Sequence, residues 1–145
     1  VWTCVLVFFR HRKPELAFSP RKVVLYFLAC TAFGAVSATL LFLIGVRNIN
    51  NPFLIMTLWI LIVLLLRPGY LKLAAGAACS FLLLYALAFK LSIVLWPEFI
   101  SYWNLSNLSG ICLEGIPLEE LEWAFLYGAS WSLGVAFIME FREKS

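Results

Sequence analysis

The sequence predicts an all-α fold, a polytopic transmembrane helix bundle of four spans plus an N-terminal helix remnant. Of the 145 residues, 63% are hydrophobic and only 13% are charged, whereas a soluble domain averages about 45–50% apolar and about 25% charged residues. The apolar residues also form long uncharged runs, several of them close to the ~20 residues that a spanning helix needs. We therefore expect residues 1–145 to form a single integral membrane domain in the lipid bilayer.

The first two apolar runs differ in completeness. We expect Val1–Phe9 to be the end of a helix that begins upstream of this sequence, so that the chain is an N-terminally truncated unit. Val23–Val46 contains no charged residue and is bracketed by Arg21-Lys22 and Arg47. This second run is long enough to cross the hydrocarbon core of a bilayer.

The next two runs are interrupted or short. Phe53–Leu66 follows Pro52, which suits a first helical turn. It crosses the bilayer only if Ile49–Asn51 are included, and a short or tilted helix is the alternative. Leu73–Trp96 is interrupted once, by Lys90. We expect the Lys90 ammonium to extend toward the outer interface, and an ion pair with a loop Glu is the alternative.

Trp123–Met139 is the fourth span, and the loop charges orient all four. The loop Arg10–Lys22 has five Lys or Arg, and the turn Arg67–Lys72 and the C-terminal tail have two each, whereas Pro97–Leu121 has none. By the positive-inside rule, the basic loops and the C-terminus are cytoplasmic. The Glu-containing loop then lies on the outer side of the membrane.

The charged residues exclude several classes of chemistry. All eight acidic residues are Glu, and the one His is His11, which excludes a Ser-His-Asp triad, an Asp-rich diphosphate–magnesium motif and a multi-His metal site. No dinucleotide-binding or P-loop motif occurs, so we expect neither a cofactor nor a metal. The cations lie between apolar spans, which does not indicate nucleic acid. The four Cys have no pairing pattern and are expected to be free thiols.

The segment Gly115–Trp123, with the sequence GIPLEELEW, contains the candidate site. Pro117 fits the first position of the last helix and so places Glu119 and Glu120 in its first turn. In the simpler interpretation, these carboxylates only complement the helix dipole. In the catalytic interpretation, Glu119, Glu120 and Glu122 repel one another and lose solvation, which raises carboxyl pKa values.

A helix N-terminus favours the charged form and opposes that rise in pKa. One protonated and one ionised Glu is therefore expected, and such a pair can act as an acid and a base. Glu120, Trp123, Tyr127 and Trp131 also share one helix face because of their 3–4–4 spacing. A carboxyl above aromatic rings suits protonation of a hydrocarbon, since π faces stabilise a carbocation. Ordinary helix packing is the alternative explanation of this aromatic stripe.

The run from Trp103 through Gly110 to Gly115-Ile116-Pro117-Leu118-Glu119-Glu120 resembles the lycopene cyclase domain family, the small flavin-free membrane cyclases of carotenoid synthesis. The resemblance covers about residues 103–127 and rests on a Pro-Leu-Glu-Glu-type motif that opens a transmembrane helix. Upstream, the chain resembles the family only as a set of apolar helices. The family usually has apolar and Phe residues after the two Glu, whereas Glu122 follows here, which leaves open which carboxyl is the proton donor.

The resemblance implies a non-redox isomerisation of a linear carotene such as lycopene. An acid protonates the terminal double bond, the neighbouring double bond attacks the tertiary cation, and a base removes a proton whose position decides the ring type. Glu119 and Glu120 would be the catalytic residues, and the substrate would be bound by Trp103, Pro117, Glu122, Trp123, Tyr127 and Trp131. Family members commonly work as two units, so we expect a second cyclase-like subunit, as in a heterodimer, or a fused repeat.

Two other functions stay open. The chain could be a non-catalytic partner subunit that shapes a pocket for another chain, and the additional Glu122 leaves room for this role. A small transporter is the third hypothesis, because intramembrane ionisable residues mark transport paths. Only Lys90 lies well inside a span, which argues against transport.

Overall fold

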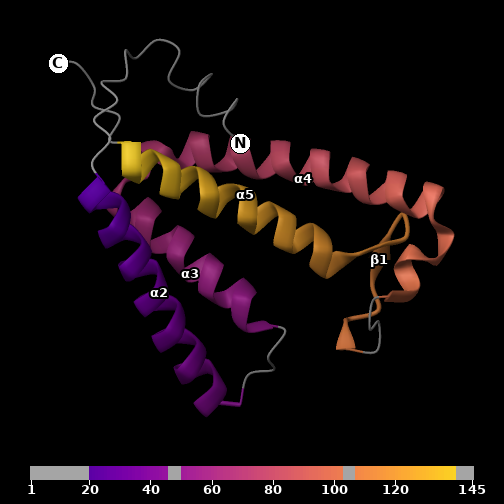
Figure 1. The fold of residues 1–145 in the computed structure, drawn as a ribbon, viewed down its shortest axis with the longest axis horizontal. Helices are drawn as coiled ribbons and strands as arrows, with labels where there is room; N and C mark the ends of the chain where they lie inside the picture. The colour runs from indigo at the N-terminus through magenta and orange to yellow at the C-terminus, as the bar shows by residue number, and fades with distance from the viewer. Residues whose placement is uncertain (1–19, 46–49, 103–106, 140–145) are drawn as a thin grey trace, which may run out of the picture.

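The computed structural model describes residues 20–45, 50–102 and 107–139, and within these ranges the chain is a bundle of helices (Figure 1). The expected helix remnant Val1–Phe9 and Trp103 lie outside the described residues. The long helices in these ranges are α2 (Pro20–Leu43), α3 (Asn50–Leu66), α4 (Leu71–Leu95) and α5 (Leu118–Met139). The short elements are two 3-10 helices, η1 (Pro68–Tyr70) and η2 (Pro97–Tyr102), and two strands, β1 (Cys112–Leu113) and β2 (Ile116–Pro117).

Helix α2 ends three residues before the predicted boundary at Val46. Gly45 has a φ of 78°, and its N–H donates a hydrogen bond to the carbonyl oxygen of Phe42 at 3.1 Å. A glycine in this left-handed conformation ends helices because it has no side chain to clash with the backbone. The uncharged run therefore continues beyond the end of α2 at Leu43.

Helix α3 begins at Asn50, so the structure includes two of the three residues that the short apolar run needed to lengthen it. Its 17 residues rise about 26 Å at 1.5 Å per residue, which is less than the ~30 Å of a bilayer core. Among the described residues, the segments long and apolar enough to cross a membrane are Val23–Leu43 and Pro68–Leu95. All four predicted helices are present, but four membrane crossings stay a prediction.

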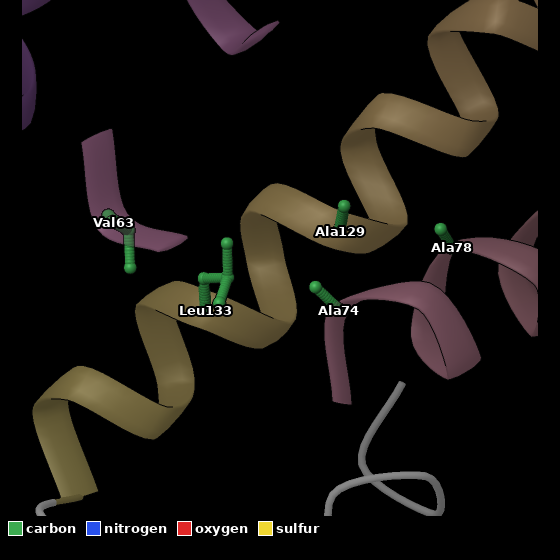
Figure 2. Packing of buried hydrophobic residues seen from close by; sticks show 5 residues of the cluster. All are labelled: Val63, Ala74, Ala78, Ala129 and Leu133. Atoms are coloured by element: carbon green, nitrogen blue, oxygen red, sulfur yellow. The ribbon is translucent and has the colours of Figure 1, made fainter. Parts of the chain in front are cut away.

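Helices α4 and α5 form the closest pair in the bundle, and small residues line the surface between them. Ala124, Ala129 and Ala136 of α5 are almost fully buried, as are Ala74, Ala77 and Ala78 of α4. Figure 2 shows Ala129 and Leu133 of α5 lying between Val63 of α3 and the two alanines of α4. Helix α5 is therefore the central element that contacts the other long helices.

Gly128 marks the point where α4 and α5 approach most closely. A Cβ atom on Gly128 would lie 2.8 Å from the carbonyl oxygen of Ala77 and 3.0 Å from the Cα of Ala78. Small residues four positions apart allow such contacts between apolar helices, and Ala124, Gly128 and Ser132 have that spacing. The position of α4 against α5 therefore depends on a residue without a side chain.

Large apolar side chains cover the outside of the bundle. Phe42 on α2 is 69% exposed, and Leu83 and Leu87 on α4 are 65% and 69% exposed. Soluble proteins bury most residues of this kind, whereas helices in lipid place small residues inside and large apolar residues outside. The described part of the chain has the second arrangement.

A small β-hairpin precedes α5, which corrects the purely α-helical prediction. Leu113 pairs with Ile116, and the two residues between them, Glu114 and Gly115, have φ values of 53° and 83°. Two consecutive positive φ values define a type I′ turn, the preferred two-residue connection of a hairpin. The Glu-Gly pair therefore forms a tight turn in the loop before the last helix.

The hairpin also changes the position of Pro117. We predicted Pro117 as the first residue of the last helix, but it lies in β2, opposite Cys112, and α5 begins at Leu118. The N–H of Leu118 donates to the carbonyl oxygen of Ile111 at 2.9 Å. This hydrogen bond connects the first turn of α5 to the residue directly before β1. The side chain of Pro117 is fully buried.

Candidate functional site

The carboxyl group of Glu120 contacts a phenol from the neighbouring helix. Glu120 lies in the first turn of α5, and the hydroxyl of Tyr85 on α4 donates a hydrogen bond to its Oε2 atom at 2.5 Å. A hydrogen bond prefers a donor–hydrogen–acceptor angle above about 150°, so it restricts the orientation of both groups. Tyr85 therefore fixes the orientation of the Glu120 carboxyl between the two helices.

Three aromatic rings continue from Glu120 along α5, as the 3–4–4 spacing predicted. The rings of Trp123 and Tyr127 stack with centroids 4.8 Å apart and an interplanar angle of 20°. Tyr127 and Trp131 stack at 6.0 Å and 12°. We call Trp123, Tyr127 and Trp131 the aromatic ladder. The prediction that these residues share one helix face is confirmed, and they form a continuous series of π faces.

Helix α4 contributes a second aromatic face that the sequence analysis missed. The ring of Phe81 lies 5.2 Å from Tyr127, and the ring of Tyr85 lies 5.6 Å from Trp123. Phe89 continues this face, with its ring 5.9 Å from that of Tyr85. These residues have the i, i+4, i+8 spacing of one helix face, and this spacing was the signal that could have identified them.

Glu119 points to a different partner and has a different electrostatic environment. The backbone N–H of Ser109 donates to its Oε1 atom at 2.5 Å. Burial raises the pKa of Glu119, but hydrogen bonds from the backbone and side chain of Ser109 and from its own backbone N–H outweigh burial and lower this pKa below its ordinary value. The expectation of a raised carboxyl pKa is therefore wrong for Glu119.

The second carboxylate oxygen of Glu119 has no hydrogen-bond partner among the described residues, although it is buried. A buried acceptor without a donor is uncommon in folded proteins. It leaves one oxygen of an ionised carboxylate available to accept a proton.

The remaining predicted site residues that the structure describes are Glu122 and Pro117. Glu122 is exposed and lies outside the aromatic cluster that the described residues form. Pro117 is a buried residue of the hairpin and directly precedes the first residue of α5. Trp103 lies outside the described residues.

Lys90 interacts with the hairpin turn, so the ion pair that was the alternative interpretation is present. Its Nζ atom donates to the carbonyl oxygen of Glu114 at 2.7 Å and lies 3.4 Å from the Oε2 atom of the same residue. The two side chains are 46% and 80% exposed, and exposed ion pairs contribute about 0–1 kcal/mol. The bond to the carbonyl oxygen is the more specific contact, and it connects α4 to the loop that precedes the site.

A cavity opens on the other side of the ladder, between α2, α3 and α5. It has a volume of about 320 Å³, and its lining includes Tyr127 and Trp131 of the ladder. Tyr26 on α2 and Trp59 on α3 form part of the opposite wall, with ring centroids 5.8 Å apart. The residues that line the cavity include no charged side chain, so it suits an apolar ligand.

The sequence model of the family described as lycopene cyclase matches residues 47–141. The chain belongs to the lycopene cyclase family. Comparisons with curated proteins and with solved structures give no match.

The matched region is wider than the motif on which the resemblance rested. It includes α3, α4, the hairpin and α5, and hence both Glu120 and its partner Tyr85. Membership of the lycopene cyclase family indicates carotenoid cyclisation as the activity of this chain.

Proposed function

We propose that this lycopene cyclase family member closes the end group of a linear carotene, and that Glu120 is the proton donor. The observation that carries this proposal is the position of the Glu120 carboxyl, hydrogen-bonded to Tyr85 at the beginning of the aromatic ladder. A general acid needs a fixed orientation and a nearby site for the cation that it creates. Glu120 combines both features, whereas Glu119 is bonded to the loop and ionised.

The reaction adds and removes one proton, and it needs no oxidant or reductant. Glu120 transfers its proton to the terminal double bond of the carotene, which leaves a tertiary carbocation. The neighbouring double bond attacks this cation, so that a carbon–carbon bond closes the ring and the positive charge moves to a ring carbon. Loss of a proton beside that carbon forms the ring double bond, and the product is an isomer of the substrate.

The aromatic rings next to Glu120 stabilise the cationic intermediates. Trp123 stacks on Tyr127 and contacts Tyr85, so a cation at this point meets several π faces. Each desolvated cation–π contact contributes about 2 kcal/mol. Water would capture a carbocation, so the proposed reaction needs these packed rings to keep water away from the cation.

Glu119 is the proton acceptor in this proposal. Its lowered pKa keeps it ionised at neutral pH, and one of its oxygens is unpartnered among the described residues. The two carboxylates are consecutive on α5 and project about 100° apart around the helix axis. An end group that lies between them can receive a proton from one and lose a proton to the other.

The exposed apolar surface and the arrangement of charges support a membrane location. In Figure 1 the beginning of α2 lies beside the end of α5, so Arg21 is at the end of the bundle opposite to Glu119 and Glu120. This arrangement agrees with basic loops on the cytoplasmic side and the Glu-containing loop on the outer side. A multi-pass topology and a second cyclase-like subunit are part of the proposal.

The direct test is expression of this chain in lycopene-accumulating cells, alone and together with a second cyclase-like unit, followed by chromatography of the pigments. We expect cyclic carotenes in at least one of these strains. The variant Glu120→Gln should leave lycopene unchanged while the protein still inserts in membranes. Glu98→Gln is the matched control, because Glu98 is exposed and is not among the proposed site residues, and it should retain activity.

The same experiment separates the catalytic role from that of a non-catalytic subunit. Cyclisation by both Glu119→Gln and Glu120→Gln in the presence of the second unit would assign the acid to that unit. Unchanged lycopene in every wild-type strain would reject the cyclase proposal itself.

A further inference from the structure

We propose that the cavity between α2, α3 and α5 binds the polyene chain of the linear carotene while its end group lies at Glu120. This inference rests on the proposed function, because it names the place of the substrate's unreactive part. The cavity of about 320 Å³ is within the range of about 300–1,000 Å³ that is usual for small-molecule sites. It holds a segment of the polyene rather than the whole molecule.

The cavity and the acid are connected by the aromatic ladder. Tyr127 and Trp131 line the cavity, and Trp123, which stacks on Tyr127, is three positions from Glu120 on α5. Glu120 and Tyr127 are seven positions apart on α5, which corresponds to about 10 Å along the helix axis. A straight hydrocarbon along this face therefore reaches the acid with its end and the cavity with its interior.

The walls of the cavity match a conjugated hydrocarbon. The rings of Phe33 and Trp59 are tilted by 52° with centroids 5.9 Å apart, and the rings of Tyr26 and Trp59 are in a T-shaped contact. The hydroxyl of Ser130, which also lines the cavity, donates to the carbonyl oxygen of Leu126 at 2.8 Å. Its proton is thus engaged within α5, and a ligand without polar atoms displaces no hydrogen bond of Ser130.

Gly134 allows α2 to close this side of the cavity. A Cβ atom at Gly134 would lie 2.2 Å from the hydroxyl oxygen of Tyr26, so this side chain packs directly against the backbone of α5. Tyr26 thereby bridges α2 and α5 at the wall of the cavity.

A lipid acyl chain is the other apolar molecule that could enter the cavity. The aromatic walls and their continuity with the ladder favour a conjugated polyene, because its π system stacks on such rings and an acyl chain has none. The experiments below distinguish a bound acyl chain from a bound carotene.

Two free cysteines provide a matched pair of variants. Cys30 on α2 lines the cavity, whereas Cys79 on α4 is exposed and takes no part in its lining. We would introduce Cys30→Phe and Cys79→Phe into the Glu120→Gln chain, purify the proteins in detergent, and measure the lycopene bound per protein from its visible absorption. We expect Cys30→Phe to reduce bound lycopene at least about tenfold and Cys79→Phe to leave it unchanged. Equal binding by the two variants would overturn the proposal.

A second measurement avoids any effect of the larger side chain on folding. In a chain whose other cysteines are replaced by serine, methyl methanethiosulfonate modifies Cys30, and mass spectrometry follows the rate. We expect lycopene in mixed micelles to slow this modification several-fold relative to phospholipid alone. Equal rates with lycopene and phospholipid would mean that an acyl chain occupies the cavity as readily, which rejects the carotene site.

The two proposals can fail separately. Lycopene binding that depends on Cys30, without any cyclic product from the wild-type chain, would support the cavity and reject the catalytic function. Cyclisation by the wild-type chain, without an effect of Cys30→Phe on lycopene binding, would support the catalytic function and reject the cavity as the carotene site.

Discussion

The hydroxyl of Tyr85 lies 2.5 Å from the Oε2 atom of Glu120, although the two residues are 35 positions apart in the sequence. This contact joins the closely packed helices α4 and α5 at the end where the first turn of α5 begins. A motif that contains Glu120 alone therefore describes half of the site, and α4 supplies the group that orients the acid.

The variant Tyr85→Phe tests Tyr85 as a positioning residue. It removes the hydrogen bond and keeps the ring that contacts Trp123. A typical hydrogen bond contributes about 0.5–1.5 kcal/mol, so we expect kcat to fall roughly 2- to 10-fold with little change in KM. Tyr102→Phe is the control, because Tyr102 is 81% exposed. A rise in KM at constant kcat would show that Tyr85 only shapes the binding site.

Gly128→Ala should destabilise the protein because the new Cβ would meet the backbone of α4 at Ala77 and Ala78. Overpacking of this kind costs about 1–3 kcal/mol, which thermal unfolding in detergent would detect as a lower Tm. Gly76→Ala is the matched control on α4, since nothing lies within 4 Å of a Cβ there. Similar Tm values for the two variants would contradict the close packing of these helices.

The lowered pKa of Glu119 predicts a pH dependence of stability. Because the folded-state pKa lies below the ordinary carboxyl value of 4.5, the unfolded chain binds more protons in this range. The stabilisation is complete above that ordinary value and is lost as the pH falls through the folded-state pKa. Glu119→Gln should weaken this dependence of the Tm between about pH 3 and pH 6, whereas Glu98→Gln at an exposed position should not. Parallel curves for wild type and Glu119→Gln would refute the assignment.

Glu114→Asn should stabilise the hairpin. Glu114 has a φ of 53°, a conformation that costs a residue with a side chain roughly 1–2 kcal/mol, and Asn-Gly is the preferred sequence for a type I′ turn. The substitution removes the exposed ion pair with Lys90. The hydrogen bond from Lys90 to the backbone carbonyl oxygen of residue 114 is kept. We expect a Tm equal to or above that of wild type. A clear decrease would mean that the ion pair outweighs the backbone strain.

The sequence was sufficient to predict the helices and the face of α5 that carries Glu120. Long apolar runs and the 3–4–4 spacing are local patterns, and local patterns determine which residues share a helix face. The ends of the helices were less predictable, because Gly45 ends α2 through a backbone conformation that hydrophobicity does not encode. The hairpin was not predicted either. Its signal in the sequence is only the two-residue Glu-Gly turn, and hydrophobicity does not encode the positive φ values of that turn.

The partners of the site could not be predicted from such patterns. The pairing of Glu120 with Tyr85 and of Lys90 with Glu114 depends on how α4 lies against α5. This arrangement is determined by small residues such as Gly128, whose importance is apparent only when the neighbouring backbone is placed. The lowered pKa of Glu119 likewise depends on Ser109, ten positions earlier in a loop.

The separate origins of the acid and of the cavity have a consequence for how this protein can change. The acid, its phenol partner and the first rings come from α4 and α5, whereas much of the cavity wall comes from α2 and α3. In the proposed arrangement, substitutions at positions such as Phe33 or Trp59 would therefore alter which polyene fits without disturbing proton transfer. Changes in α2 and α3 would then alter the substrate preference, while α4 and α5 would preserve the proposed chemistry.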